Sequence, residues 1–413
     1  MKIAFFTDAY YPRINGVAVS VHTYALQLAQ MGHSVCIVCC NYDNSVEPKS
    51  HSRSHYDLEF QKQHPNLKVF RASADDTAFS KEDKLAKLHA WHSVKKAMDE
   101  FKPDIVHINS EFTIGYFGLI YARHRRVACV YTFHTLWEDY VEGYVNYFAV
   151  YPMKKIAKEL IRFYLKRADV VIAPTNHISD VVKKYHIERE VKILPTGIPP
   201  ATEIKSIKAE AMYFLQLHNL LPYPQKKHIL LYVGRVVKEK NLEFLLHVLN
   251  RVRKTYNDTM LVLVGGGPEL ENLQKKAVEL KCAKNVCFAG YRTKNELAYF
   301  YDISDVFVFS SKTETQGLVT LEAMMAGVPV VAIGEMGTVD VMQGDHGGFM
   351  VKDDEEEFAQ KTLELLQNKE LYKQKSEEAK AWADNWSLER LTNKLVTYYE
   401  EALEIESKKQ FHH

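Results

Sequence analysis

The sequence lacks a long hydrophobic run: nowhere in its 413 residues is there an apolar stretch of about 18 residues, the length that a membrane-spanning helix needs. It also lacks an excess of charge. The 53 Lys and Arg residues nearly match the 52 Asp and Glu residues, and a net charge of +1 argues against a general nucleic-acid-binding protein. The segment that follows Met1 lacks the apolar core of a secretion signal, which predicts a cytoplasmic protein.

Cysteine is scarce, with six in the chain. Cys36, Cys39 and Cys40 share the apolar run 34–40, and metal or redox pairs use the spacing of Cys36 and Cys39. No second pair lies nearby, and unpaired cysteine is common in buried strands. The sequence therefore favours a core strand with reduced thiols over a metal site or a disulfide framework.

Short apolar runs alternate with amphipathic segments through most of the chain, a pattern typical of parallel strands joined by crossover helices. Helices are expected at 17–32 and 84–101. Strands are expected at 2–7, 34–40, 67–72, 104–108, 129–133, 170–174 and 191–195, and again at 229–234, 260–265, 286–290, 306–310 and 328–332.

The length exceeds what a single core usually organises, so two domains are expected. The less regular segment 197–228 separates the two series of strands and is interpreted as the connection between domains. The predicted fold class is α/β, with two doubly wound parallel-sheet domains. Their bounds are 1–197, together with a crossing-back helix at 386–413, and 198–385.

Ligands of open parallel sheets bind beyond the carboxyl ends of the strands, and unusual residues follow several strands here. Gly16 begins a helix after the first strand, where backbone N–H groups could meet an anion. Arg235 and Lys240 flank the turn after strand 229–234, and two cations at that place suit a diphosphate. Solvated surface charges are the alternative for each cation taken alone.

Two carboxylates, Glu314 and Glu322, lie on either side of the turn and helix start at Gly317, Leu318 and Val319. Backbone amides at that start could hold a phosphate, and a carboxylate accepts hydrogen bonds from paired sugar hydroxyls. The pattern predicts one glutamate for each sugar of a nucleotide-sugar, with the diphosphate between them.

The glycine-rich turn 265–267 is not the dinucleotide fingerprint, because Leu270 occupies the third glycine position, and this argues against hydride transfer. No Asp-x-Asp motif follows a strand, so the sequence implies no metal and no other cofactor.

The spacing of Glu314 and Glu322 and the segment 317–332, together with segments 194–198, 234–241 and 385–391, resemble the retaining GT-B glycosyltransferases of family 4. The resemblance covers essentially the whole chain. It implies two facing Rossmann-like domains, a nucleotide-sugar held mainly by the second, and a C-terminal helix that crosses back to the first.

By this resemblance, Glu314 binds the donor sugar, Glu322 binds the ribose, and Arg235 and Lys240 bind the diphosphate, which Gly16 faces through its amide. The implied mechanism is attack on the same face of the sugar that the leaving group departs from, with the diphosphate taking the proton of the acceptor. Glu314, Arg235 and Lys240 are thus catalytic candidates as well as donor ligands.

Three further residues take roles from the same resemblance. His134, which follows the strand 129–133, matches the histidine near the reacting centre, and a buried core histidine is the alternative. Tyr291 and Arg292 lie in the turn where the family recognises the base of the donor.

The acceptor is expected at the first domain, where segments 107–119 and 131–148 resemble bacterial glucosyltransferases that act on diacylglycerol. That resemblance implies UDP-glucose as donor. The segment 153–167 has an apolar face and a basic face, as interfacial helices do, and aromatic residues precede it. The candidate membrane and acceptor residues are Trp137, Tyr140, Lys154, Lys155, Lys158 and Arg162.

These features predict a monotopic enzyme bound to the anionic cytoplasmic face of a membrane. An ordinary helix packed on a sheet has the same two faces, so the membrane role is one of two interpretations. The others kept open are a soluble sugar or small-molecule acceptor with the same donor chemistry, and a nucleotide-sugar-binding protein without catalysis. The oligomeric state is not predicted.

Overall fold

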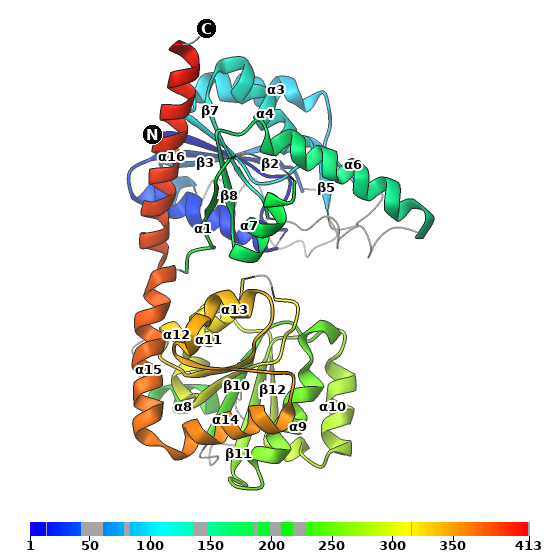
Figure 1. Ribbon diagram of the computed structural model, residues 1–413, viewed down its shortest axis with the longest axis vertical. Coiled ribbons are helices and arrows are strands. Elements are labelled where there is room, and N and C mark those ends of the chain that lie inside the picture. The colour runs from blue at the N-terminus through cyan, green and yellow to red at the C-terminus, as the bar shows by residue number, and fades with distance from the viewer. Residues whose placement is uncertain are drawn as a thin grey trace. The chain divides into compact units, whose positions relative to one another are not determined.

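The structure is a computed structural model that describes residues 1–13, 15–42, 61–77, 83–134, 147–185, 189–198, 208–217, 228–314 and 316–411 (Figure 1). The chain divides into two compact units, which we call unit 1 and unit 2. Unit 1 comprises Met1–Gly197 and Leu388–His413, and unit 2 comprises Ile198–Ser387.

Unit 1 is built on a parallel sheet with strand order β3-β2-β1-β6-β7-β8-β9. Its strands are β1 (Lys2–Phe6), β2 (Ser34–Cys40), β3 (Leu67–Ala72), β6 (Ile105–Ile108), β7 (Ala128–Thr132), β8 (Val170–Ala173) and β9 (Val191–Ile193). Strands such as β1 and β2 are buried along nearly their whole length, because helices cover both faces of the sheet.

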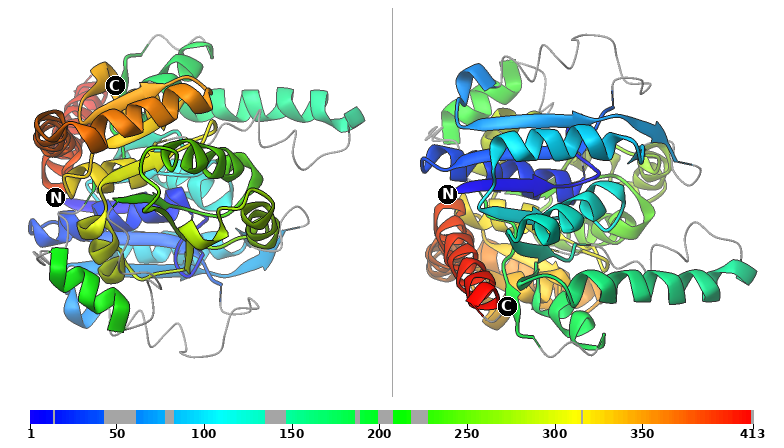
Figure 2. Two further views of the ribbon diagram at one scale, coloured as in Figure 1. Left: turned by 90° about the horizontal axis from the view of Figure 1, so that it is seen from below. Right: turned by 90° about the horizontal axis from the view of Figure 1, so that it is seen from above.

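Two groups of helices cover the two faces of this sheet (Figure 2). The helices are α1 (Gly16–Gln30), α3 (Ala90–Phe101), α4 (Thr113–Arg125), α6 (Tyr147–Leu165), α7 (Asn176–Lys183) and α16 (Leu388–Phe411). The first group is α3, α4, α6 and α7, which share one hydrophobic core with alternate residues of the strands. The second is α1 and α16, which contact each other and β2, β7 and β8.

The segment 84–101, expected as one helix, contains a strand and then a helix. The strand β5 (Lys84–Ala86) pairs antiparallel with β4 (Ala74–Asp76), and α3 begins only at Ala90. Tertiary contacts hold β5 extended: the Ala86 N–H donates to Thr113 Oγ1 at 2.7 Å, and the buried Lys84 pairs with Asp76 at 3.0 Å. The helical periodicity of the segment does not encode these long-range partners.

Unit 2 contains the second parallel sheet, in the order β12-β11-β10-β13-β14-β15. Its strands are β10 (His228–Val233), β11 (Thr259–Val264), β12 (Val286–Gly290), β13 (Val306–Phe309), β14 (Val330–Ile333) and β15 (Gly348–Val351). Its helices are α8 (Lys208–Leu217), α9 (Leu242–Val252), α10 (Leu270–Glu279), α11 (Lys294–Ile303), α12 (Leu318–Met325), α13 (Gly337–Val341), α14 (Glu355–Gln367) and α15 (Lys369–Ala383). The two sheets confirm the predicted α/β fold class.

The helix α8 lies inside the segment 197–228 that was expected to be an irregular connection. Ala211 and Leu215 are fully buried, and α8 packs against α11. This helix is therefore part of the core of unit 2.

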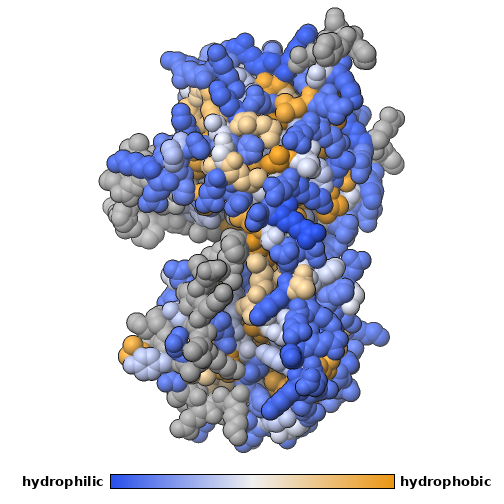
Figure 3. Space-filling view, turned by 90° about the vertical axis from the view of Figure 1, so that its left-hand side faces the viewer, coloured by the Kyte–Doolittle hydropathy of each residue, from blue (hydrophilic) through white to orange (hydrophobic). Residues whose placement is uncertain are grey.

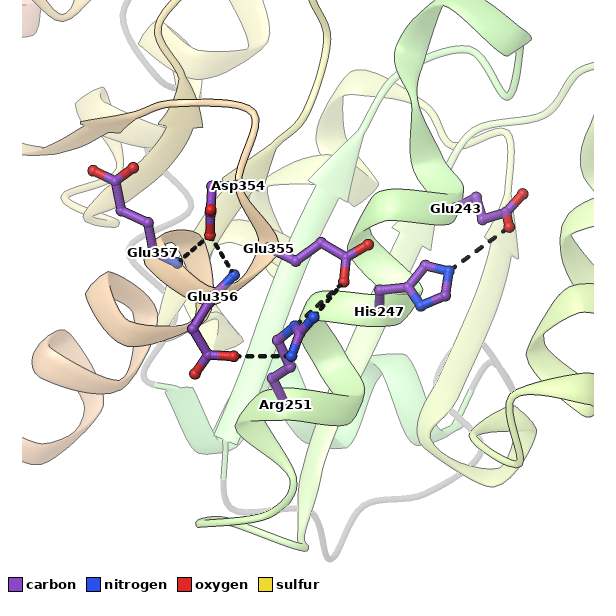
Figure 4. A network of polar contacts seen from close by, with 7 residues as sticks. All are labelled: Glu243, His247, Arg251, Asp354, Glu355, Glu356 and Glu357. Atoms are coloured by element: carbon purple, nitrogen blue, oxygen red, sulfur yellow. Dashed lines mark hydrogen bonds and ion pairs between the residues drawn. The ribbon is translucent and has the colours of Figure 1, made fainter.

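Charged residues fix the packing of α14 on α9, as Figure 4 shows. Asp354 caps α14 by accepting from the N–H groups of Glu356 and Glu357, at 2.8 and 2.9 Å. Arg251 of α9 donates to Glu355 and Glu356, each at 2.8 Å, so it links the two helices through the first turn of α14. Acidic side chains there also suit the positive end of the helix dipole.

The helix α16 is part of unit 1 and makes polar contacts with its sheet at two points along the helix. His107 of β6 contacts the Tyr399 hydroxyl through Nδ1 at 2.8 Å and the Thr132 hydroxyl through Nε2 at 2.7 Å. Further along, Lys409 pairs with Asp169, a carboxylate that also accepts from the Cys129 N–H at 2.7 Å. The surface of unit 1 on the side of α16 is mostly hydrophilic (Figure 3).

The buried His107 predicts that acid weakens unit 1. Burial, with a smaller effect of the charge on His134, lowers the pKa of His107 from 6.5 to about 3. Between these two pKa values His107 binds a proton in the unfolded chain but not in the folded chain. The free energy of unfolding therefore falls as the pH drops below 6.5. His107 alone should cost about 2 kcal/mol between pH 7.5 and pH 5.

Chemical unfolding of the wild type and of His107→Asn at several pH values measures this effect. The variant starts less stable, because it loses the contact with Tyr399, but its stability should depend less on pH over this range. Equal slopes for the two proteins would contradict the assignment of the acid sensitivity to His107.

Candidate functional site

Each sheet reverses its strand order beside its first strand, and ligands of doubly wound folds bind beyond the carboxyl ends of the strands at that point. In unit 2 the reversal lies between β10 and β13. The turn after β10 carries Arg235 and Lys240, and the loop after β13 carries Glu314. These three predicted donor residues therefore follow the two strands that flank the switch point of unit 2.

Lys240 and Glu314 form an ion pair, with 2.7 Å between Nζ and Oε2. Both side chains are largely buried, with 13% and 21% of their surfaces exposed. Lys240 Nζ also lies 3.4 Å from Ser311 Oγ, and the Lys240 carbonyl accepts from Ser310 Oγ at 2.9 Å. The structure thus brings together Lys240, which was predicted to bind the diphosphate of a donor, and Glu314, which was predicted to bind its sugar.

Gly317 begins the helix α12 in a left-handed conformation, with φ of 62°. No side chain caps this helix, and the N–H groups of a first helical turn have no partner within the helix. The Gly317 carbonyl accepts from Thr320 at 3.0 Å, and the Glu314 carbonyl accepts from Gly337 at 2.7 Å. The amides of Leu318 and Val319 therefore lie at a helix start suited to an anion.

Glu322 lies one turn inside α12, where Tyr301 of α11 donates to its Oε2 at 3.1 Å. Tyr301 is buried, and burial together with this carboxylate raises its pKa well above 10. Tyr301 therefore stays a neutral donor that orients Glu322. Tyr301 was not predicted from the sequence, because only the fold brings α11 beside α12.

Arg235 is mostly exposed and forms a 3.4 Å pair with Glu239, so it is a loosely held cation at the rim of the turn. Tyr291 packs its ring on Gly266, where a Cβ atom would come within 2.5 Å of the ring, and its hydroxyl donates to the Gly266 carbonyl at 3.0 Å. Arg292 follows it, with a buried Nε atom that has no hydrogen-bond partner among the described residues.

In unit 1 the strand order reverses between β1 and β6. Gly16, the first residue of α1, follows β1 and is exposed, and a Cβ atom built there would meet nothing within 4 Å. Asn15 caps the helix by accepting from the Ala18 N–H at 2.8 Å. Gly16 thus lies at an open helix start on the carboxyl side of this sheet.

His134 follows β7 and lies 3.0 Å from the side-chain oxygen of Asn109, measured from its Nε2 atom. Because that oxygen can only accept, Nε2 carries the proton and Nδ1 is left as an acceptor. Burial lowers the pKa of His134 to about 4, so the ring is neutral near pH 7. His134 is therefore partly buried and held by the neighbouring strand, and its environment suits a neutral acceptor of a hydrogen bond.

Two buried carboxylates at the same edge of this sheet were not anticipated from the sequence. Asp8, 5% exposed, accepts from Ile114 N–H at 3.0 Å and from the hydroxyls of Ser110 and Thr113, and burial raises its pKa. Glu111, 4% exposed, accepts from the Tyr131 hydroxyl. The sequence gives little sign of them, since each is a single acid inside an apolar segment.

The basic face predicted for segment 153–167 lies on α6, whose amino-terminal end projects beyond the rest of unit 1 in Figure 2. Trp137 and Tyr140 lie outside the described residues, and so does the side chain of Lys154. Lys155 is exposed, whereas Lys158 lies 6.0 Å from the Tyr185 ring and Arg162 pairs with Glu159 at 2.7 Å.

The apolar residues of α6 divide between the core and the surface. Ile161, Tyr164 and Leu165 are buried, but Leu160 is 36% exposed. It lies one turn before Phe163, whose ring contacts Tyr116 of α4 at 6.3 Å between centroids. Leu160 therefore belongs to an exposed apolar patch rather than to the core.

We call this group the apolar patch, and its members are Phe112, Tyr116 and Leu160. Phe112 is 41% exposed and Tyr116 is 42% exposed. They lie at the start of α4, next to the buried Glu111, and Tyr164 of α6 donates to the carbonyl of Glu111 at 3.2 Å. The patch thus borders the carboxyl edge of the sheet, where the candidate residues of unit 1 lie.

Within the described ranges, no group of three or more His, Cys, Asp or Glu side chains is placed to hold a metal ion. No described helix is long and apolar enough to cross a membrane. The cysteine pattern at Cys36 and Cys39 is part of the buried strand β2, and all six thiols are buried and unpaired by disulfides.

Comparisons with known proteins agree with this arrangement. The model of the family described as Glycosyltransferase Family 4 matches residues 14–202, and the model described as Glycosyl transferases group 1 matches residues 216–382. The chain is 30% identical over 338 residues to the alpha-monoglucosyldiacylglycerol synthase of Streptococcus pneumoniae, which covers 81% of this chain and 71% of the relative.

A protein of the same name from Acholeplasma laidlawii is 28% identical over 415 residues, covering 99% of each chain. Among solved structures, the Anabaena protein HepE in complex with UDP superposes with a TM-score of 0.72 at 16% identity, covering 96% of this chain and 99% of that one. The fold and the matches define a glycosyltransferase of the GT-B class. The chain belongs to glycosyltransferase family 4.

Proposed function

We propose that this glycosyltransferase moves a glucosyl residue from UDP-glucose to diacylglycerol at the surface of a membrane, with retention of the anomeric configuration. The observation that carries the acceptor is the apolar patch of Phe112, Tyr116 and Leu160, which borders the candidate site of unit 1. An exposed apolar surface beside an active-site edge suits a substrate with acyl chains. The two relatives described above are named for a glycolipid of this kind.

The donor half of the proposal is based on unit 2. The diphosphate would displace Glu314 from Lys240, so that Lys240 and Arg235 meet the phosphate oxygens and Glu314 becomes available to the hydroxyls of the sugar. The open start of α12 and Gly16 would add backbone amides, and Glu322, oriented by Tyr301, would meet the ribose. Tyr291 and Arg292 would border the base.

Catalysis would then be electrostatic. Charge develops on the leaving diphosphate as its bond to the sugar breaks, and the cations and amides that face it stabilise that charge. The acceptor hydroxyl attacks from the same face, and the departing diphosphate takes its proton. His134, neutral and held by Asn109, would position the sugar through Nδ1. No metal or other cofactor enters the proposal.

A transfer assay tests this function. Purified protein, UDP-glucose labelled in the sugar and mixed micelles of diacylglycerol are incubated, and the organic phase is counted. We expect label in the organic phase, and more of it when the micelles contain anionic lipid. Label that stays in water while UDP is released to a soluble sugar acceptor would exclude the lipid and support the alternative that keeps the same donor chemistry.

A membrane-bound enzyme predicts that α6 and the apolar patch both contribute to lipid binding. Replacing Lys155, Lys158 and Arg162 by Glu reverses three charges near the surface, where each basic residue contributes about 1 kcal/mol of attraction to anionic lipid. We expect vesicle binding to fall by at least about tenfold, and Tyr116→Ser with Leu160→Ser to weaken it independently of salt.

The matched control replaces Lys275, Lys369 and Lys373 by Glu, three exposed positions of α10 and α15 in unit 2. Flotation with vesicles of phosphatidylcholine and phosphatidylglycerol measures binding. If the charge-reversed α6 variant floats as well as the wild type and the control, the attachment of unit 1 to membranes through the basic face of α6 is wrong, whatever the acceptor proves to be.

A further inference from the structure

Unit 1 contains a cavity of about 650 Å³ at the amino ends of its strands, the opposite end of the sheet from the candidate site. Its walls are the last turns of α4 and α16, the residues that follow α6, and the residues at or just before the beginning of β7, β8 and β9. These are the amino ends of the strands, whereas His134, Asn109 and Asp8 follow the carboxyl ends. The cavity is therefore separate from the catalytic edge of this unit.

Cations dominate the lining of this cavity. Six are present: Arg123, Arg126, Lys166, Arg167, Arg189 and Lys409. Two carboxylates oppose them, Asp169 and Glu406, and both interact with Lys409, which pairs with Asp169 and lies 3.2 Å from Glu406. Both carboxylates of the lining therefore pair with Lys409, and cations outnumber carboxylates in the lining of the cavity.

Ion pairs do not account for the cations at the mouth of the cavity. Among the described residues, Arg123, Lys166 and Arg189 are exposed and form no ion pair, whereas the adjacent Arg125 makes two hydrogen bonds to Asp99, at 2.9 and 2.7 Å. Like charges gathered without partners raise the energy of the folded state, and an anion that enters would lower it.

Arg167 gives a second, independent indication. Its guanidinium lies 3.9 Å above the Phe163 ring, and Nη1 donates to the Phe163 carbonyl at 3.1 Å. Its Nε atom is buried and has no hydrogen-bond partner among the described residues. The stacking and the Nη1 hydrogen bond fix the position of this guanidinium, which forms part of the lining of the cavity.

We propose that this cavity binds a small anion with one or more phosphate groups. Arginine forks and lysine ammonium groups are the usual ligands of phosphate oxygens, and the volume lies within the range of small-molecule sites. The anion would be a soluble phosphate ester or the headgroup of an anionic lipid, since the two present the same oxygens. This inference does not depend on the identity of the sugar acceptor.

Binding there would act on α16. Lys409 and Glu406 lie near the end of this helix, which begins at Leu388, directly after unit 2. An anion shared between Lys409 and the cations at the ends of α4 and α6 would hold the end of α16 on the sheet. A ligand that binds only the folded form raises the unfolding temperature, so stability reports on the site without any assay of transfer.

Titration of the full-length protein with inorganic pyrophosphate tests the site. Three proteins are compared: the wild type, the double variant Arg123→Glu with Lys166→Glu, and the control Lys96→Glu with Lys184→Glu. The control makes the same change in charge at exposed positions of unit 1 outside the cavity. Because all three retain the donor site of unit 2, any difference between them belongs to the cavity.

We expect the cavity variant to bind pyrophosphate at least tenfold more weakly than the wild type and the control, and to lose several degrees of the stabilisation that pyrophosphate gives. The increase in unfolding temperature that pyrophosphate gives the wild type should become smaller as sodium chloride is added. A parallel arm uses vesicles with and without phosphatidylglycerol. If the cavity variant loses only the binding to vesicles with phosphatidylglycerol, the ligand is a lipid headgroup. If it loses the binding to pyrophosphate, the ligand is a soluble phosphate ester. Equal behaviour of the three proteins in both arms overturns the proposal.

Discussion

Glu314→Gln is expected to lower kcat/KM for sugar transfer by about 10³-fold, the scale on which a single electrostatic contact to a transition state acts. The amide keeps the size of the side chain but loses the charge that pairs with Lys240 at 2.7 Å. It also accepts hydrogen bonds from sugar hydroxyls more weakly than a carboxylate does. The loss should appear in the steady-state rate while the unfolding temperature changes little.

The control for this variant is Glu377→Gln, an exposed glutamate of α15 that loses its charge in the same way. It should transfer sugar at the rate of the wild type. Activity of Glu314→Gln within about threefold of the wild type would remove Glu314 from the chemistry, because an interaction that matters in the transition state costs far more than that.

Lys240→Met is expected to weaken the binding of UDP by about 10²-fold, because a diphosphate loses a charge-assisted partner that is held in place. Lys240 is held by the short helix Lys238–Lys240 and by the Ser310 hydroxyl on its carbonyl. The neighbouring Lys238 is exposed, so Lys238→Met is the matched control and should bind UDP normally.

The two variants together separate the roles of the pair. UDP has no sugar beyond its diphosphate, so Glu314→Gln should bind UDP as well as the wild type, or more tightly, because Lys240 is released from its partner. Calorimetric titration with UDP measures both variants. A loss of UDP affinity in Glu314→Gln equal to that in Lys240→Met would be incompatible with the assignment of the carboxylate to the sugar.

The sequence was informative about the fold because parallel strands buried on both faces appear as short apolar runs, such as those of β2 and β11, whose residues are rich in Val, Ile, Leu and Cys. The family was recognisable from the spacing of Glu314 and Glu322 around Gly317. What the sequence could not supply were contacts between distant segments. Lys240 and Glu314 are 74 positions apart and meet only because β10 and β13 are neighbours.

Several misses have the same cause. The strand β5 was hidden in a helical pattern, because its partners β4 and Thr113 lie elsewhere in the chain. The apolar periodicity of α6 does not show which of its residues face the core, and Leu160 is one that remains exposed. Asp8 and Glu111 gave no signal at all, since a buried acid is recognised by the donors around it and not by its neighbours in the sequence.

The structure of the product tests the proposed transfer of glucose to diacylglycerol with retention. The wild type is incubated with UDP-glucose and diacylglycerol micelles, the glycolipid is isolated, and its sugar linkage is determined by NMR. UDP-glucose carries an α linkage, so retention predicts a monoglucosyl diacylglycerol that is α-linked, and none is expected from Glu314→Gln. A β-linked product would contradict retention, and glucose found only on a water-soluble acceptor would contradict the lipid.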